Sequence, residues 1–344
     1  MTHHAADSRL AMRHMALMSH AVRIADTARR HAHPNPWVGA VIECEDGRMF
    51  DGVTQPPGGP HAEIVAIRSA EHAGAPTAGA TLYSTLEPCN HTGRTGPCTE
   101  AIIAAGITTV VMGITDPDQK VAGTGITRLE NAGVTVVAGV LAHDVARQLA
   151  PYVHHRATGR PYVVLKMATT LDARTAAPGP ERWITGETAR RRVHEMRAES
   201  DAIVVGARTV IEDDPELTVR HVDGESPRRI VLARTTQIPP DARVHPCTVW
   251  RDDMETLLDT LGRDGAMQVM VEGGPTIASE FHSRGLIDEY VFHVAPTVNG
   301  RHDAPGVFVG SDSMPLARFT IESSTALGPD IEIVMKPTRE KAPA

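Results

Sequence analysis

The stretch from His61 to Cys98 decides how the first half of this chain is interpreted. It contains His61-Ala62-Glu63, then Pro88-Cys89, and then Pro97-Cys98. One imidazole and two thiolates can hold a zinc ion through three protein ligands and leave a fourth position open for water, while a neighbouring carboxylate moves protons. We therefore predict a zinc site formed by His61, Cys89 and Cys98, with Glu63 as its catalytic acid and base.

The spacing of the two cysteines limits how this site can be built. The H-x-E…P-C-x-x-C signature of zinc deaminases places its cysteines three apart, whereas Cys89 and Cys98 are nine apart. The turn-rich residues 90–97 must then form a loop that brings the thiols together. Cys98 begins an apolar run over 98–105, and a thiol in the first turn of a helix is more easily deprotonated. Ordinary buried cysteines are the alternative, but they leave the His-x-Glu and the two Pro-Cys pairs unexplained.

The pattern around this stretch predicts an α/β fold. Because strands and helices alternate, we expect an open sheet with a ligand site at the carboxyl ends of its strands. The expected helices are 8–30, one beginning near residue 61, 98–105, 124–132 and 142–149, and the expected strands are 38–44, 80–86, 107–114 and 134–140.

Length and composition limit the possible functions. A chain of 344 residues predicts two domains, here 1–150 and 161–340, joined by a linker over 151–160 that contains proline, glycine and basic residues. The net charge of −8 and the 3% of aromatic residues argue against nucleic acid as a partner. We expect a cytoplasmic protein without a membrane segment or disulfide framework, and the sequence is compatible with a homo-oligomer.

The second half repeats a strand–glycine–helix pattern. It occurs at 202–214 and at 268–284, where Gly273 and Gly274 would let a phosphate approach a helix N-terminus. A tight turn without a ligand explains these glycines equally well. Arginines 190–192 are typical of a solvated helix face, so Arg197 is the better candidate for a phosphate clamp.

Several motifs together resemble a known family. His61-Ala62-Glu63-Ile64 and the run from Leu86 to Cys98, with residues 33–39 upstream, are similar to the deaminase half of the bifunctional riboflavin-biosynthesis deaminase/reductases. The motifs at 166–172, 183–186, 206–215 and 272–276 are similar to the reductase half. The resemblance implies a cytidine-deaminase-like zinc domain followed by a dihydrofolate-reductase-like domain that uses NADPH.

The resemblance also implies roles for individual residues. In the deaminase half, substrate contacts fall on Asn35, His91 and Arg94. Cofactor contacts fall on Ala168, Trp183, Thr209, Asp213, Gly274, Pro275 and Thr276. Contacts with the reductase substrate fall on Lys166, Arg197, Leu217, Arg220 and Glu272, of which Arg197 and Arg220 suit its phosphate.

The implied reaction has two steps on a small phosphorylated pyrimidine. The first exchanges an amine for oxygen on the ring of a diamino-ribosylamino-pyrimidinone 5′-phosphate, and the second reduces its ribosyl group to ribityl with NADPH. Thr54, Gly96, Thr170, Ala173 and Glu181 depart from the family's usual residues, and a carboxylate at 181 would repel a phosphate.

Three alternatives stay open. They are a chain in which only one half is active, a nucleic-acid base deaminase, and a structural zinc module, which would need a fourth protein ligand.

Overall fold

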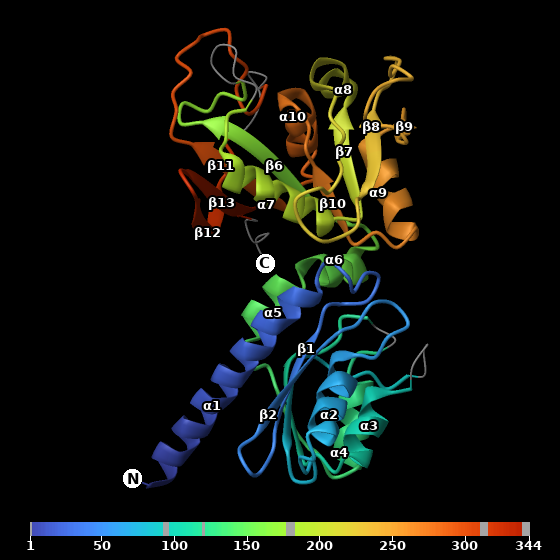
Figure 1. Ribbon diagram of the computed structural model, residues 1–344, viewed down its shortest axis with the longest axis vertical. Helices are drawn as coiled ribbons and strands as arrows, with labels where there is room; N and C mark the ends of the chain where they lie inside the picture. Colours follow the sequence, from blue (N-terminus) through green and yellow to red (C-terminus); the bar gives the residue numbers. More distant parts are fainter. Residues whose placement is uncertain (1, 92–95, 119–120, 177–182, 310–315, 339–344) are drawn as a thin grey trace, which may run out of the picture. The chain divides into compact units, whose positions relative to one another are not determined.

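The computed structural model describes residues 2–91, 96–118, 121–176, 183–309 and 316–338. It divides into a first unit, Met1–Thr158, and a second unit, Gly159–Ala344. Each unit has its own sheet (Figure 1). The mixed α/β fold expected from the alternating pattern is present in both.

The expected linker over 151–160 is largely helical. Residues Ala150–Thr158 form α6, in which Pro151 and Tyr152 are buried. Proline is tolerated in the first turn of a helix, where its missing N–H has no intrahelical partner to lose. Pro151 is therefore compatible with the start of a helix and does not mark an irregular connection.

The first unit is a five-stranded sheet in the order β2-β1-β3-β4-β5. β1 is antiparallel to β2 and β3, whereas β3, β4 and β5 are parallel. The carboxyl ends of β3 and β4 therefore meet at one edge of the sheet, and that edge carries the candidate site. The strands are β1 (Gly39–Glu43), β2 (Met49–Val53), β3 (Thr81–Leu86), β4 (Thr109–Ile114) and β5 (Thr135–Ala138).

Glycines allow two helices of this unit to lie close to its strands. A Cβ atom on Gly39 would lie 2.1 Å from the carbonyl oxygen of Ala21 in α1, and one on Gly52 would lie 2.1 Å from that of Ala62 in α2. Neither position therefore has room for a side chain. The helices are α1 (Thr2–Ala25), α2 (Ala62–His72), α3 (Cys98–Ala104), α4 (Thr124–Asn131) and α5 (Ala142–Gln148), with a short 3-10 turn, η1 (Asp26–Ala28), after α1.

The second unit is an eight-stranded sheet in the order β12-β13-β11-β6-β10-β7-β8-β9. The strands from β11 to β9 are parallel, and β13 and β12 add an antiparallel edge. The strands are β6 (Tyr162–Thr170), β7 (Ala202–Gly206), β8 (Arg228–Leu232), β9 (Thr248–Trp250), β10 (Gln268–Val271), β11 (Glu289–Ala295), β12 (Phe319–Leu327) and β13 (Asp330–Pro337).

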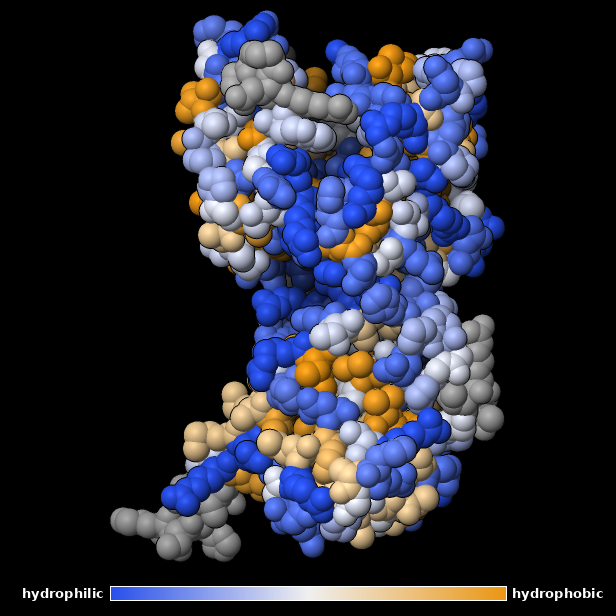
Figure 2. Space-filling view, viewed as in Figure 1, coloured by the Kyte–Doolittle hydropathy of each residue, from blue (hydrophilic) through white to orange (hydrophobic). Residues whose placement is uncertain are grey.

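The helices that the structure describes in the second unit are α7 (Glu187–Ala198), α8 (Ala207–Asp213), α9 (Met254–Arg263) and α10 (Pro275–Ser283). Buried strand residues such as Val163, Leu165 and Val269 form one core with Leu257 and Phe281. Figure 2 shows hydrophilic residues over much of the visible face of each unit, interrupted by smaller apolar patches. Within the described ranges, none of the helices combines the length and apolar character needed to cross a membrane.

Candidate functional site

The structure brings the three predicted zinc ligands together. His61 is the N-cap of α2, Cys89 follows β3, and Cys98 is the first residue of α3. Their ligand atoms all lie within 4.8 Å of one another. The His61 Nδ1 atom is 3.5 Å from the Cys89 Sγ atom and 3.3 Å from the Cys98 Sγ atom.

These distances fit a tetrahedral zinc ion. With Zn–S near 2.3 Å and Zn–N near 2.0–2.1 Å, tetrahedral angles place a nitrogen and a sulfur about 3.6 Å apart. The hydrogen bond between the two thiols lowers the pKa of Cys89 and raises that of Cys98, so Cys89 is the first of the pair to ionise. A thiolate is therefore favoured at this centre, as a metal ligand must be.

Glu63 lies beside this centre on the first turn of α2. Its side chain is buried, and its Oε2 atom is 3.6 Å from the Cys98 Sγ atom. Burial, reinforced by the negative charge at Cys89, raises the pKa of Glu63 to about 7. A carboxyl group that ionises near neutrality can both take up and release a proton at working pH.

A cavity of about 390 Å³ opens over the centre. His61, Glu63 and Cys89 line it, and so do Asn35 and His91, two of the three residues expected to contact the deaminase substrate. The third, Arg94, lies outside the described residues, as does Glu181.

Thr54, one of the departures noted in the sequence, also lines this cavity. It is buried, and its hydroxyl accepts a hydrogen bond of 2.9 Å from the Val38 N–H. Thr54 therefore holds the backbone beside β1 in place.

Glu87, an acidic residue of the cavity wall, had no role assigned from the sequence. Its carboxylate accepts hydrogen bonds from the backbone N–H groups of Asp116, Gly123, Gly125 and Ile126 at 2.9–3.3 Å, and so holds Asp116 and the start of α4 in place. Asp116 also lines the cavity, and its position just after a strand is compatible with either a site residue or a turn residue. The position of Glu87, directly after a buried strand and before Pro88-Cys89, was the available signal for a special role.

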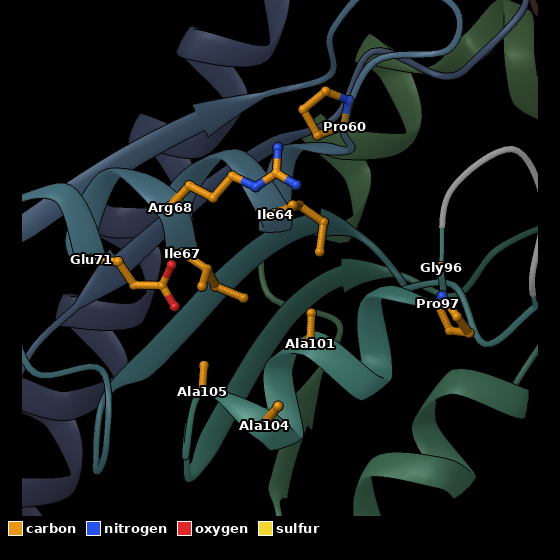
Figure 3. Close-up of a pocket in the computed structure, with 10 residues that line it drawn as sticks. All are labelled: Pro60, Ile64, Ile67, Arg68, Glu71, Gly96, Pro97, Ala101, Ala104 and Ala105. Carbon is orange, nitrogen blue, oxygen red and sulfur yellow. The ribbon is translucent and has the colours of Figure 1, made fainter.

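A second hollow of about 400 Å³ lies between α2 and α3 (Figure 3). Ile64 and Ile67 of α2 face Ala101 and Ala104 of α3 and its C-cap residue, Ala105, across it. It is lined largely by aliphatic side chains and by none of the zinc-ligand candidates, so it is separate from the catalytic cavity.

In the second unit, the structure gathers Lys166, Arg197 and Glu272 into one charged cluster. The Arg197 Nε and Nη2 atoms donate to the two oxygens of Glu272 at 3.0 and 2.9 Å. Although burial opposes ionisation, the charges of Arg197 and Lys166 hold the pKa of Glu272 below its usual value. Burial lowers the pKa of the Lys166 ammonium group, and Glu272 opposes that effect.

Arg197 and Arg220, the two arginines expected to bind the substrate phosphate, make different contacts within the protein. For Arg197, both Nε and Nη2 contact Glu272. Its Nη1 atom donates to the Thr218 carbonyl oxygen at 3.2 Å, so all three guanidinium nitrogens have partners within the protein. Arg220 has a more exposed side chain and contacts Thr218 and Glu216. The phosphate-binding role of both arginines stays a prediction.

The side chain of Leu217, another residue expected to contact the reductase substrate, lies in the core. It is buried in a cluster with Ile203 and Val205, and the φ of Leu217 is 55°. Only the backbone of Leu217 is available for substrate contact. His194, which the sequence did not single out, accepts the Arg220 backbone N–H at its Nδ1 atom, and burial together with neighbouring arginines lowers the pKa of its imidazole to about 4.

The expected cofactor residues lie along several elements. Ala168 is on β6, while Thr209 and Asp213 are on α8. Gly274 is the N-cap of α10, and Pro275 and Thr276 begin that helix. Trp183 is exposed, with the Arg190 guanidinium 5.5 Å from its ring centroid.

The start of α10 fits a phosphate-bearing cofactor such as NADPH. Its N-cap is a glycine without a side-chain cap, so its first-turn N–H groups remain available to an anion. A Cβ atom on Gly274 would lie 3.6 Å from the Thr209 hydroxyl oxygen. Thr209 and the 274–276 turn therefore lie side by side, as a shared cofactor site requires.

Family models match both units. The "RibD C-terminal domain" model matches residues 161–333, and the "Cytidine and deoxycytidylate deaminase zinc-binding region" model matches residues 12–114. These two matches agree with the two halves expected from the sequence motifs.

Individual relatives match nearly the whole chain. The riboflavin biosynthesis protein RibD of Mycobacterium tuberculosis is 41% identical over 87% of this chain and 90% of its own length. The Escherichia coli protein of the same name is 36% identical over 91% of this chain and 96% of its own length.

Solved structures agree with this similarity. The structure of Acinetobacter baumannii RibD superposes with a TM-score of 0.87 at 35% identity, covering 96% of this chain and 100% of that chain. The diaminohydroxyphosphoribosylaminopyrimidine deaminase/5-amino-6-(5-phosphoribosylamino)uracil reductase of Thermotoga maritima superposes with a TM-score of 0.83 at 33% identity, covering 95% and 99%. The chain therefore belongs to the RibD family, the bifunctional deaminase/reductases of riboflavin biosynthesis that combine a zinc-dependent deaminase with an NADPH-dependent reductase.

Proposed function

We propose that the first unit deaminates the pyrimidine with His61, Cys89 and Cys98 as zinc ligands and Glu63 as the proton carrier. The bound ion supplies an activated water at the open end of the site. Glu63 accepts a proton from the attacking water and returns protons to the ring nitrogen and to the departing ammonia. The close grouping of the three ligand atoms beside a buried carboxyl group is the observation that carries this proposal.

For the second unit, we propose that NADPH reduces the ring-opened ribosyl group. The cofactor supplies the hydride, and the Thr209 and 274–276 region binds it. Lys166 and Glu272 hold and transfer the proton that accompanies ring opening, since burial makes the Lys166 ammonium group a stronger acid. Arg220 binds the substrate phosphate, while Arg197 holds Glu272 in place.

We also propose that the enzyme acts in the cytoplasm on a small phosphorylated pyrimidine and not on nucleic acid. The acidic net charge of −8 and the low aromatic content of 3% support this substrate class, because nucleic-acid binders depend on clustered cations and stacking rings. A sedimentation measurement would establish whether the enzyme forms a homo-oligomer.

Mass spectrometry of the diaminopyrimidine 5′-phosphate incubated with enzyme and zinc tests both activities. We expect an amine-for-oxygen exchange without NADPH and a further gain of two hydrogens only when NADPH is added. Exchange without reduction would mean that only the first unit is active. The absence of any exchange would overturn the assignment of the zinc centre.

A further inference from the structure

Helix α6 contributes a wall of the deaminase cavity. Tyr152 and Arg156 both line that cavity, and they are four residues apart, so they share one face of the helix. The Arg156 guanidinium carbon is 5.1 Å from the centroid of the Tyr152 ring. The segment that was expected to be a linker therefore adds side chains to the catalytic cavity.

Tyr152 is itself fixed against the end of β4. Its side chain is buried, and its hydroxyl donates to the Asp116 carboxylate, with oxygen–oxygen distances of 3.0 and 3.3 Å. A ring held in this way provides a rigid surface for the guanidinium, because cations are attracted to the face of an aromatic ring. The fixed Tyr152 ring therefore holds the Arg156 side chain along the cavity wall.

The ionisable side chains that line the cavity are mostly acidic. Four carboxyl residues take part: Glu63, Glu87, Asp116 and Asp118. Among the lining residues that the structure describes, Arg156 is the only arginine or lysine. Deamination does not require such a cation, but a substrate carrying a phosphate needs a positive partner to offset this negative wall.

Arg156 can serve as that partner. Its Nε atom is 3.8 Å from an Asp118 carboxylate oxygen, which is longer than a hydrogen bond, and its side chain is 33% exposed. Since a guanidinium carries five N–H donors, a phosphate can bind without displacing the Tyr152 ring. Asp118 and Tyr152 then orient the donor that the substrate uses.

We propose that Arg156 binds the 5′-phosphate of the substrate in the deaminase cavity and so favours the phosphorylated pyrimidine over the free nucleoside. This inference rests on the proposed deaminase function and adds Arg156 to the residues that bind the substrate. It assigns to α6 a role in selecting the substrate of the first reaction.

The test compares two substrates and four proteins in the deamination step, measured without NADPH. The substrates are the diaminopyrimidine riboside with and without its 5′-phosphate. The proteins are the unmodified enzyme, Arg156→Gln, Arg156→Lys, and the control Arg147→Gln, whose arginine pairs with Asp144 on α5 and does not line the cavity. Thermal melts and zinc content establish that each variant is folded and loaded.

We expect Arg156→Gln to raise KM for the phosphorylated substrate by about tenfold or more, the equivalent of one charge-assisted contact, with kcat little changed. Its kinetics on the nucleoside should match those of the unmodified enzyme. For Arg156→Lys we expect a KM for the phosphorylated substrate between those of the unmodified enzyme and Arg156→Gln, because lysine retains the charge without the planar guanidinium fork. Arg147→Gln should behave like the unmodified enzyme.

Two results would overturn the inference. One is an equal loss of kcat/KM on both substrates in Arg156→Gln, which would mean that Arg156 only supports Tyr152 and Asp118. The other is an unchanged preference for the phosphorylated substrate. Failure of the unmodified enzyme to deaminate either compound would instead refute the proposed function on which the inference rests.

Discussion

Glu63 is a carboxyl group held where burial opposes its charge. The pKa of about 7 that results places it between its acid and base forms at neutral pH. That pKa follows from the burial of this carboxyl group and from its position beside Cys89.

Substituting Glu63 by Gln should abolish deamination while leaving the metal in place. The amide has nearly the same shape but cannot carry a proton, so we expect turnover to fall by roughly 10²–10⁴-fold with zinc content unchanged by metal analysis. Glu71→Gln is the matched control, since Glu71 lies on the same helix but faces the second hollow. Undiminished turnover in Glu63→Gln would show that another group moves the proton.

Substituting Glu272 by Gln should destabilise the second unit. The change leaves the buried Arg197 guanidinium without its charged partner, and we expect a loss of about 3 kcal/mol in the free energy of unfolding, measured by urea denaturation. Glu280→Gln is the control, because Glu280 pairs with the more exposed Arg234 and Arg284, and we expect less than about 1 kcal/mol there. Equal midpoints of urea denaturation for the two variants would show that the buried Arg197–Glu272 pair contributes no net stability.

At the scale of elements, the contact between β2 and α2 positions two functional side chains. Ala62 lies between His61 and Glu63, and its carbonyl oxygen would be 2.1 Å from a Cβ atom on Gly52. The packing of a helix against a strand therefore sets where the start of α2 presents His61, the proposed metal ligand, and Glu63, the proposed proton carrier.

Substituting Gly52 by Ala should therefore move α2 and weaken zinc binding. Backbone atoms of Ala62 and Ala66 would both clash with the new methyl group, so we expect a loss of stability of more than 2 kcal/mol and a weaker zinc affinity in a chelator competition assay. Gly47→Ala is the control, since that glycine has nothing within 4 Å of its added Cβ atom and a φ of +84°; we expect about 1 kcal/mol and unchanged zinc affinity. Unaltered zinc affinity in Gly52→Ala would contradict the positioning role.

At the scale of the whole molecule, each of the two units carries its own sheet and its own candidate site. The proposed zinc ligands lie within residues 61–98, whereas the Lys166, Arg197 and Glu272 cluster lies in the second unit. The chemistry of the second reaction requires no residue of the first site.

Removal of zinc should therefore separate the two reactions. After treatment with a chelator, we expect deamination to be lost and restored by added zinc, while reduction of the already deaminated substrate continues with NADPH. Absorbance of NADPH and mass spectrometry of the product measure the two steps independently. Loss of reduction on chelation, with restoration by zinc, would show that the second unit depends on the metal.

The sequence by itself determined the zinc-ligand grouping and the alternation of strands and helices. His-x-Glu and Pro-Cys are local patterns, and His61, Cys89 and Cys98 lie where such patterns place metal ligands. No helix or strand was predicted over residues 221–267, although this range contains the signals of a helix. Asp253 caps α9 by accepting a hydrogen bond of 2.7 Å from the Thr256 N–H, and Leu257, Leu258 and Leu261 follow a helical spacing.

Only the tertiary structure decided which charged side chains pair with one another and which segments line a site. The Arg197 side chain is occupied by Glu272, a residue 75 positions away, and no local pattern encodes such a pairing. Arg192, expected on a solvated face, instead pairs with Glu332 of β13. In the same way, residues 151–160 were expected to be a linker because of their proline, glycine and basic residues, whereas the contribution of α6 to the cavity depends on the contact of Tyr152 with Asp116, two residues after β4.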